Sequence, residues 1–200
     1  MKRCSLIIPD AGPINSLWVA DQLSLLLKLD MTIILIDVVY DELTSDPINW
    51  PKDNAVKKFV EGHTPPFIIE TTGTGAEARA KQGRGEKLKK NVVDVAIADF
   101  MSDGIEKYVT TSDPVVILYE DKDISQVQFL RRPRNLHLLS TVGLLRGLES
   151  VNLISSADEI INEMLHPTKS DRKPRILTDL PGGTDIPAQI GSVWTPPKHR

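Results

Sequence analysis

The pattern that decides the fold is contained in residues 5–36, SLIIPDAGPINSLWVADQLSLLLKLDMTIILI. A short apolar run rich in β-branched residues, at 5–8, precedes a longer amphipathic stretch over 13–29, and a second apolar run follows at 32–36. Short runs of this kind predict buried strands, and the apolar spacing between them predicts helix. A strand, a helix and a second strand in this order predict a right-handed crossover between parallel strands.

The same alternation continues as far as residue 166. Further strands are expected where short apolar runs recur, at 67–69, 108–110 and 136–139. Amphipathic stretches predict helices at 38–43, 53–61, 76–103, 141–149 and 156–164. We therefore predict an α/β fold, with a mostly parallel central sheet and helices on both faces.

The composition narrows the class of protein. The 200 residues are 40% hydrophobic and 26% charged, which is typical of a soluble globular protein. No apolar run approaches the roughly 18 residues of a membrane span, so we exclude a membrane protein. Pro9 interrupts the first apolar run too early for an export signal, and the single cysteine, Cys4, cannot form an internal disulfide. We expect a cytoplasmic protein.

Acidic residues are expected at the ends of several strands, where parallel sheets bind their ligands. Asp10 follows the first apolar run, Asp113 follows the fourth, and Glu42 lies in the helix directly after the second. Asp94 lies within an apolar helical stretch, where a carboxylate needs a partner, a proton or a metal. Each acid alone also has a structural interpretation, such as a helix cap at Asp10 or an ion pair between Asp94 and Lys90.

Taken together, these acids predict a metal site. Carboxylates that converge at one sheet edge repel each other unless cations neutralise them. Carboxylate oxygens are the ligands that Mg²⁺ and Mn²⁺ prefer, and such sites serve the attack of water on a phosphodiester. No histidine spacing, nucleophile elbow or phosphate-binding loop indicates another chemistry.

Other acidic residues near these segments have different expected roles. Glu86 precedes Asp94 by eight positions on the expected helix and is retained as an auxiliary residue. Asp99 lies about 140° round that helix from Asp94 and is set aside. A further group is interpreted as a solvated charge cluster that could touch an outer metal position: Glu120, Asp121 and Asp123.

Four short segments resemble the PIN-domain family of metal-dependent nucleases, particularly its VapC-like toxins and related prokaryotic proteins. They are DAGPINSL at 10–17, VVYDEL at 38–43, DVAIA at 94–98 and TTSD at 110–113. The resemblance covers residues 4–155 and implies a carboxylate pocket for Mg²⁺ or Mn²⁺, formed by Asp10, Glu42, Asp94 and Asp113. Asn15 or Ser16 matches the polar residue that supports the first acid in this family.

The resemblance implies a metal-dependent endoribonuclease, because family members usually cut single-stranded or structured RNA. A homodimer is implied as well and, for a toxin of a toxin–antitoxin pair, a cognate antitoxin protein. The alternative is a PIN-like scaffold that binds RNA or a partner protein without cutting. Convergence of all four acids favours the nuclease, whereas an Asp113 that is turned away favours the scaffold. The insertion over 48–66 is not typical of the family.

Two basic regions are candidates for further contacts. Arg84, Lys87 and Lys90, in the segment that leads to Asp94, are predicted to bind substrate, unless they form an ordinary solvated face. Residues 167–200 hold six of the 14 prolines and a net charge of +3, so the first 166 residues sum to −6. We predict a domain over 1–166 and an extended basic tail over 167–200. The tail either docks on the acidic domain through residues such as Trp194 or acts as a free arm for RNA.

Overall fold

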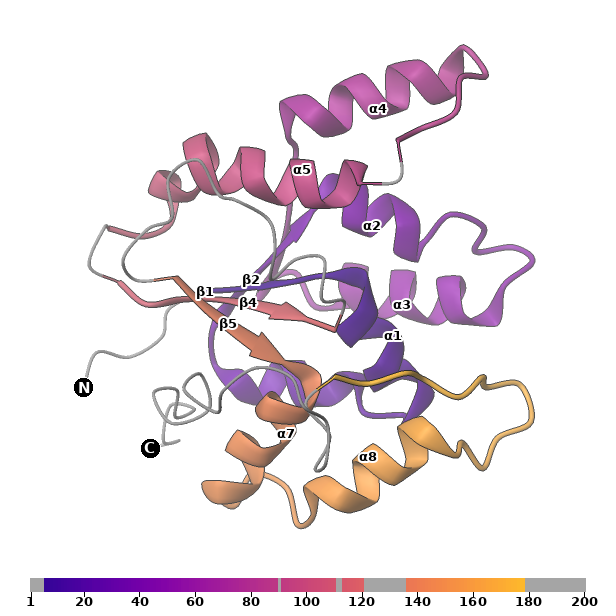
Figure 1. Cartoon of the computed structure of the whole chain (residues 1–200), viewed down its shortest axis with the longest axis vertical. Coiled ribbons are helices and arrows are strands. Elements are labelled where there is room, and N and C mark those ends of the chain that lie inside the picture. The colour runs from indigo at the N-terminus through magenta and orange to yellow at the C-terminus, as the bar shows by residue number, and fades with distance from the viewer. Residues whose placement is uncertain (1–5, 90, 111–112, 121–135, 179–200) are drawn as a thin grey trace.

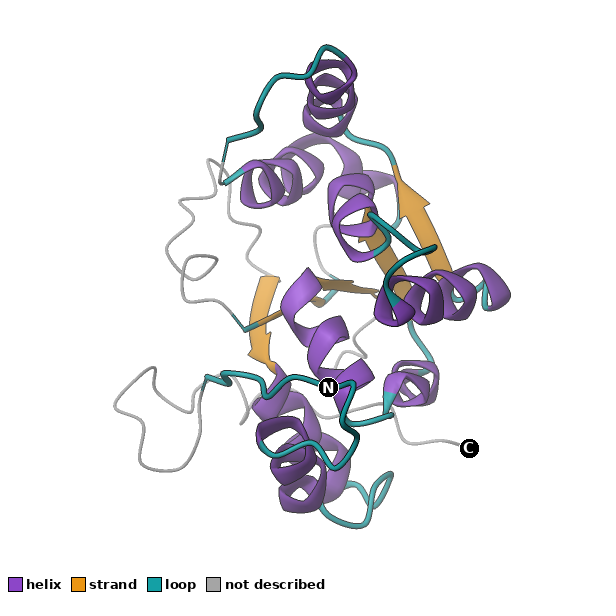
Figure 2. Cartoon of the chain, turned by 90° about the vertical axis from the view of Figure 1, so that its right-hand side faces the viewer, coloured by secondary structure: helices purple, strands orange, loops and turns teal. Residues whose placement is uncertain are grey.

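The computed structural model describes residues 6–89, 91–110, 113–120 and 136–178 (Figure 1). Its five strands form one sheet in the order β3-β2-β1-β4-β5, and every neighbouring pair is parallel. Helices lie on both faces of this sheet, so the predicted α/β class is confirmed (Figures 1 and 2). The strands are β1 (Leu6–Pro9), β2 (Thr32–Ile36), β3 (Phe67–Glu70), β4 (Val115–Tyr119) and β5 (Leu136–Ser140).

Helical segments form each connection of the sheet that the structure describes. The path from β1 to β2 contains α1 (Ala11–Val19) and the 3₁₀ segment η1 (Leu23–Leu29), and the path from β2 to β3 contains α2 (Asp37–Leu43) and α3 (Pro51–Gly62). Between β3 and β4 lie α4 (Gly73–Gly83), α5 (Val92–Asp99), the π-helical turn η2 (Phe100–Gly104) and the 3₁₀ turn η3 (Ile105–Lys107). After β5 follow α7 (Thr141–Ser150) and α8 (Ala157–Leu165).

The strand order contains a reversal next to β1. From β1 the chain moves through β2 to β3 at one edge, and then returns to β4 on the other side of β1. Right-handed crossovers place the helices of these two halves on opposite faces of the sheet. At such a reversal the loops after neighbouring strands separate and leave a crevice, where α/β sheets bind ligands. The crevice here lies between the carboxyl ends of β1 and β4.

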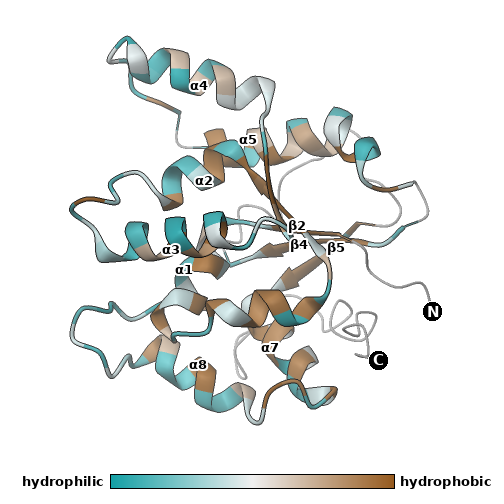
Figure 3. Ribbon diagram, turned by 180° about the vertical axis from the view of Figure 1, so that it is seen from behind, coloured by the Kyte–Doolittle hydropathy of each residue, from teal (hydrophilic) through white to brown (hydrophobic). Residues whose placement is uncertain are grey.

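The core lies on both sides of the sheet. All residues of β1 and β4 are buried, as continuous apolar runs in parallel sheets normally are. Hydrophobic residues are concentrated in the strands, while the helices alternate between hydrophobic and hydrophilic sides (Figure 3). Within the described ranges, no helix has the length and apolar character needed to span a bilayer.

The strand predicted at 108–110 is wrong, because the fourth strand is β4, later in the chain. Tyr108 instead ends the turn η3 and donates its hydroxyl hydrogen bond to Glu70 (2.7 Å). Thr110 donates to the carboxylate of Asp113 through its amide (2.8 Å) and its hydroxyl (2.7 Å). The helix expected over 76–103 is likewise divided, since α4 ends at Gly83.

The described part of the C-terminal tail, residues 167–178, lies across α1. The guanidinium of Arg172 stacks on the ring of Trp18 at 3.4 Å and forms an ion pair with Asp21 (3.0 Å). The backbone N–H of Arg175 donates to the carbonyl of Met164 (2.9 Å), and the side chain of Leu177 is buried. This part of the tail therefore docks on the domain. The contact predicted for Trp194 lies outside the described residues.

Candidate functional site

Asp10 lies at the start of the crevice between β1 and β4. Its backbone N–H donates to the carbonyl of Leu118 (2.9 Å), which joins the ends of the two strands. Asp10 occupies the N-cap position of α1, but its side chain makes no capping hydrogen bond. The third position of α1 is Pro13, which has no N–H to donate to a cap. The side chain of Asp10 therefore does not cap α1.

The electrostatic environment of Asp10 brings together acids from separate elements. The pKa of its carboxyl group is raised from 3.8 to about 6, mainly by burial. The negative charges of Glu42, Asp94 and Glu120 contribute to this increase, and the backbone N–H of Ala11 acts in the opposite direction. These three residues lie in α2, in α5 and directly after β4, respectively. Their charges are therefore near enough to influence the carboxyl group of Asp10. We call Asp10, Glu42, Asp94 and Glu120 the carboxylate cluster.

The pKa of Glu42 is also affected by burial and by another acid of the cluster. Burial raises the pKa of its carboxyl group, the charge of Asp94 raises it as well, and Lys52 acts in the opposite direction. Asp94 therefore interacts electrostatically with both Asp10 and Glu42. The convergence of these three acids on one metal ion stays a prediction.

The predicted solvated charge cluster is wrong for Glu120. Its side chain is buried and accepts a hydrogen bond from the hydroxyl of Thr141 (2.7 Å). Gly12 leaves the space that Glu120 occupies, since a Cβ at position 12 would lie 3.1 Å from the Glu120 Cβ. Glu120 is buried because it directly follows β4, where Thr141 and Arg175 contact its carboxylate. Asp121 and Asp123 lie outside the described residues.

Asp113 does not belong to the carboxylate cluster. It precedes β4, whereas Asp10 and Glu120 follow the strands β1 and β4, which are parallel neighbours. A strand rises about 3.3 Å per residue, so the length of β4 separates Asp113 from the cluster by roughly 20 Å. The predicted role of Asp113 depended on a strand at 108–110. Glu120 occupies the place at the end of the fourth strand that was assigned to Asp113.

Arg175 brings a positive charge from the docked tail to this acidic cluster. Its guanidinium donates to the hydroxyl of Ser16 (3.0 Å), to the carbonyl of Gly12 (3.5 Å) and to the carboxylate of Glu120 (3.2 Å). The hydroxyl of Ser16 is buried and serves as an acceptor for Arg175. The sequence signal for this contact was the basic charge of the tail, which gave no indication of the particular arginine.

The other predicted residues lie on the surface or outside the described ranges. Arg84 forms an ion pair with Glu86 (2.5 Å), and both side chains are exposed. Glu86 is not among the charges that raise the pKa of Asp10. Lys87 is exposed, and Lys90 lies outside the part of the chain that the structure describes.

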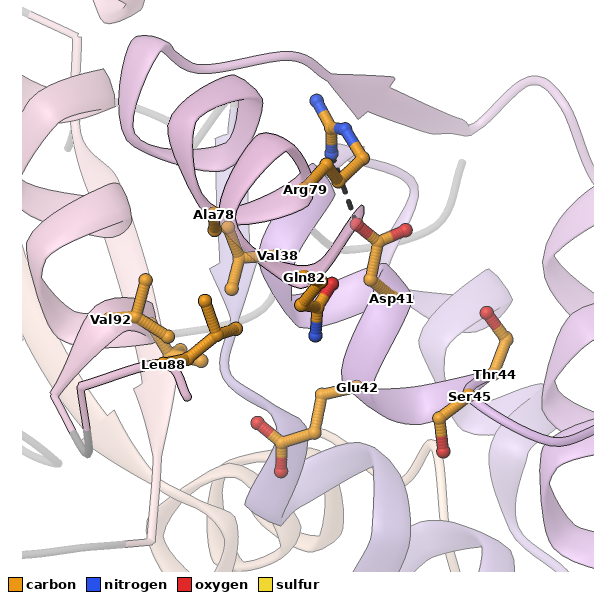
Figure 4. A pocket seen from close by; sticks show the side chains of 11 residues that line it. Val38, Asp41, Glu42, Thr44, Ser45, Ala78, Arg79, Gln82, Leu88 and Val92 are labelled. Carbon is orange, nitrogen blue, oxygen red and sulfur yellow. Dashed lines mark hydrogen bonds and ion pairs between the residues drawn. The ribbon is translucent and has the colours of Figure 1, made fainter. Parts of the chain in front are cut away.

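Ser45 lines two cavities, of which the first includes Glu42 of the cluster and the second includes Arg175, the ion-pair partner of Glu120. The first, of about 530 Å³, lies between α2, α4 and α5 and is lined by Glu42 and Gln82 (Figure 4). Arg79 also lines this cavity, but its guanidinium is held by Asp37 (2.6 Å) and Asp41 (3.0 Å). The second cavity, of about 590 Å³, lies beside α1 and the docked tail.

The second cavity combines Asn15, which the resemblance selected, with residues that it did not select. Its lining includes Asn15, Trp50, Lys52 and Arg175. The side-chain oxygen of Asn15 is buried and has no hydrogen-bond partner among the described residues. Trp50 and Lys52 belong to the segment 48–66, and local sequence did not indicate that they share a cavity with the docked tail.

The chemistry of the cluster suits a hard divalent cation. Its side chains offer only carboxylate oxygens, which Mg²⁺ and Mn²⁺ prefer, and a cation would relieve the repulsion that opposes ionisation of Asp10. Among the described side chains, no group of three or more His, Cys, Asp or Glu residues is already arranged as metal ligands. The residues fit the predicted metal by the chemistry and charge of their oxygens, and not by their arrangement in this structure.

Comparisons with known protein families and with curated proteins find no match for this chain. The function is therefore argued from the residues of the crevice.

Proposed function

We propose that this protein is a metal-dependent ribonuclease that hydrolyses RNA phosphodiester bonds at the carboxylate cluster. The observation that carries the proposal is the placement of Asp10 and Glu120 at the carboxyl ends of the neighbouring strands β1 and β4, with Glu120 packed against Gly12. The charges of Glu42 and Asp94 also reach Asp10, whose pKa is raised to about 6 mainly by burial. The raised pKa values of Asp10 and Glu42 lower the stability of the fold at neutral pH, because these two carboxyl groups ionise at lower pH in the unfolded chain. A divalent cation bound between the carboxylates would offset this cost.

The residues of the cluster differ in their surroundings and therefore in their expected roles. Asp10, Glu42 and Asp94 are the residues we expect to hold Mg²⁺ or Mn²⁺. When bound, the ion supplies an activated water and stabilises negative charge on the phosphate. Glu120 is fixed by Thr141 and Arg175, so it holds one edge of the site in a constant orientation. Arg175 and Lys52 add positive charge that attracts the RNA backbone.

One observation favours the alternative of an RNA- or protein-binding scaffold. The ion pair between Arg175 and Glu120 neutralises one carboxylate of the cluster without a metal ion. The position of Asp113 is also the criterion that favoured the scaffold. By that criterion the scaffold is favoured. We retain the nuclease as the first proposal because Glu120 supplies an acid at the end of the fourth strand. A homodimer and an antitoxin partner remain predictions from the resemblance.

The test is the incubation of the purified full chain with an end-labelled RNA pool in Mn²⁺, in Mg²⁺ and in EDTA. The ribonuclease proposal predicts cleavage with either metal and none in EDTA. The variant D10N should not cleave under any of these conditions. Cleavage that persists in EDTA, or in D10N at the wild-type rate, would contradict the proposal. Binding of RNA without cleavage in Mn²⁺ and Mg²⁺ would support the scaffold instead.

A further inference from the structure

The second cavity presents an exposed aromatic side chain on a well-ordered turn. Trp50 is 60% exposed although it is one of the largest apolar side chains of the chain. Its backbone N–H donates to the carbonyl of Asp46 (3.0 Å), and Pro51 begins helix α3 directly after it. The side chain of Asn49 donates to both carboxylate oxygens of Asp46 (3.1 and 2.9 Å). These contacts fix the backbone that carries the indole, so its exposure is a property of the folded turn.

Basic side chains surround this aromatic residue. Lys52, Lys173 and Arg175 line the same cavity, which also contains two acids, Asp53 and Asp171. Asp53 is already occupied, because it accepts hydrogen bonds at one oxygen from the Ser45 hydroxyl (3.0 Å) and the Asp46 N–H (2.9 Å) and pairs with Lys52 through the other (3.1 Å). A flat aromatic face with nearby cations is the combination that binds single-stranded nucleic acids, through base stacking and phosphate contacts.

Asn15 contributes a buried side-chain oxygen that lacks a hydrogen-bond donor among the described residues. Its buried side-chain oxygen can only accept a hydrogen bond, and none of the described residues donates one. An unsatisfied buried acceptor is costly, so a ligand that donates to this oxygen once the Asn15 side chain has rotated toward the cavity gains affinity. The ribose 2′-hydroxyl is a donor that RNA has and DNA lacks. Asn15 also precedes Ser16, the residue that holds Arg175 beside the carboxylate cluster.

We propose that this cavity is a subsite for one unpaired nucleotide of an RNA strand. The base stacks on Trp50, the adjoining phosphate lies beside Lys52 and Lys173, and the 2′-hydroxyl donates to Asn15. The inference rests on the proposed function, since Arg175 links the cavity to the carboxylate cluster and the strand continues past it to the site of cleavage. It assigns a recognition role to the 48–66 insertion.

Binding without cleavage provides the test. The full chain is titrated in EDTA against fluorescently labelled oligouridylate of about 12 nucleotides, and Kd is measured by anisotropy. Stacking of one base predicts that W50A raises Kd roughly 5- to 100-fold. W50F should bind more tightly than W50A, because it keeps an aromatic face. The matched control is I48A, since Ile48 is 93% exposed, two residues away and not part of the cavity lining.

The hydrogen bond to the ribose is tested by exchanging the sugar. Oligodeoxyuridylate of the same length should bind the wild type more weakly than oligouridylate, and N15A should reduce this difference. The inference is overturned if W50A binds RNA like the wild type, if I48A loses as much affinity as W50A, or if W50F binds no better than W50A. It is also overturned if the wild type binds both sugars equally.

These results are independent of the ribonuclease proposal. A chain that cleaves RNA in Mn²⁺ while W50A binds normally in EDTA refutes the subsite alone. A chain that binds RNA through Trp50 but does not cleave it refutes the ribonuclease proposal alone.

Discussion

Replacement of Asp10 by asparagine removes a charge from the centre of the carboxylate cluster and keeps the shape of the side chain. The carboxyl group has an ordinary pKa of 3.8 and a pKa of about 6 in the folded protein, mainly because of burial. Below about pH 4 it is protonated in both states and the folded protein has its full stability. As the pH rises from about 4 to about 6, Asp10 ionises in the unfolded chain but stays largely protonated in the folded protein. The wild type therefore loses stability over this range.

The size of this effect follows from the difference between the two pKa values. A shift from 3.8 to about 6 corresponds to about 3 kcal/mol of unfolding free energy at pH values above both. D10N cannot ionise and escapes this loss. We therefore expect D10N to be more stable than the wild type by up to about 3 kcal/mol at about pH 8 in EDTA, and similar at about pH 4. For a chain of this size, the difference corresponds to an increase in Tm of about 6–12 °C.

Urea unfolding in EDTA at the two pH values measures the prediction. The matched control is D113N, because Asp113 accepts hydrogen bonds from Thr110 and lies outside the carboxylate cluster. D113N should show no gain in stability at the higher pH. The reasoning is refuted if the stability difference between D10N and the wild type is the same at both pH values, or if D10N is less stable at about pH 8.

Two further substitutions test the contacts that hold the site together. G75A should lower the unfolding free energy by about 1–3 kcal/mol, because the added Cβ would lie 2.2 Å from a carboxylate oxygen of Asp37. The control is G83A, since a Cβ at position 83 would have nothing within 4 Å. Urea unfolding should show no comparable loss for G83A. R175A should cost about 1–3 kcal/mol, because it leaves the buried carboxylate of Glu120 without its ion pair, and an unchanged urea midpoint would contradict this role of the docked tail.

The fold could be predicted because its signals are local. The buried strands β1, β2 and β5 coincide with short apolar runs, and parallel connections follow from the helices between them. The fourth strand was misplaced because the β-branched residues at 108–110 resemble a strand, although Tyr108 is drawn into a turn by Glu70. The stronger signal was the unbroken apolar run of β4, in which all five residues are buried.

The candidate site could be predicted only where strand ends were placed correctly. Asp10, Glu42 and Asp94 were selected from the first three segments, and their charges influence one another in the structure. Glu120 was missed because its burial depends on Thr141 and Arg175, which are distant in the chain. No local pattern reveals a contact of this kind. The environment of Trp50 was missed for the same reason, since the docked tail forms part of its cavity.

In the proposed catalytic site, four carboxylates meet at the crevice between β1 and β4, with Glu120 in place of Asp113. Its most direct test is the rate of RNA cleavage in Mn²⁺ for the wild type, E120Q and D113N. We predict that E120Q loses most of the activity, because Arg175 loses the ion pair that holds it beside the site, and that D113N cleaves at nearly the wild-type rate. An active E120Q together with an inactive D113N would contradict this assignment of the site.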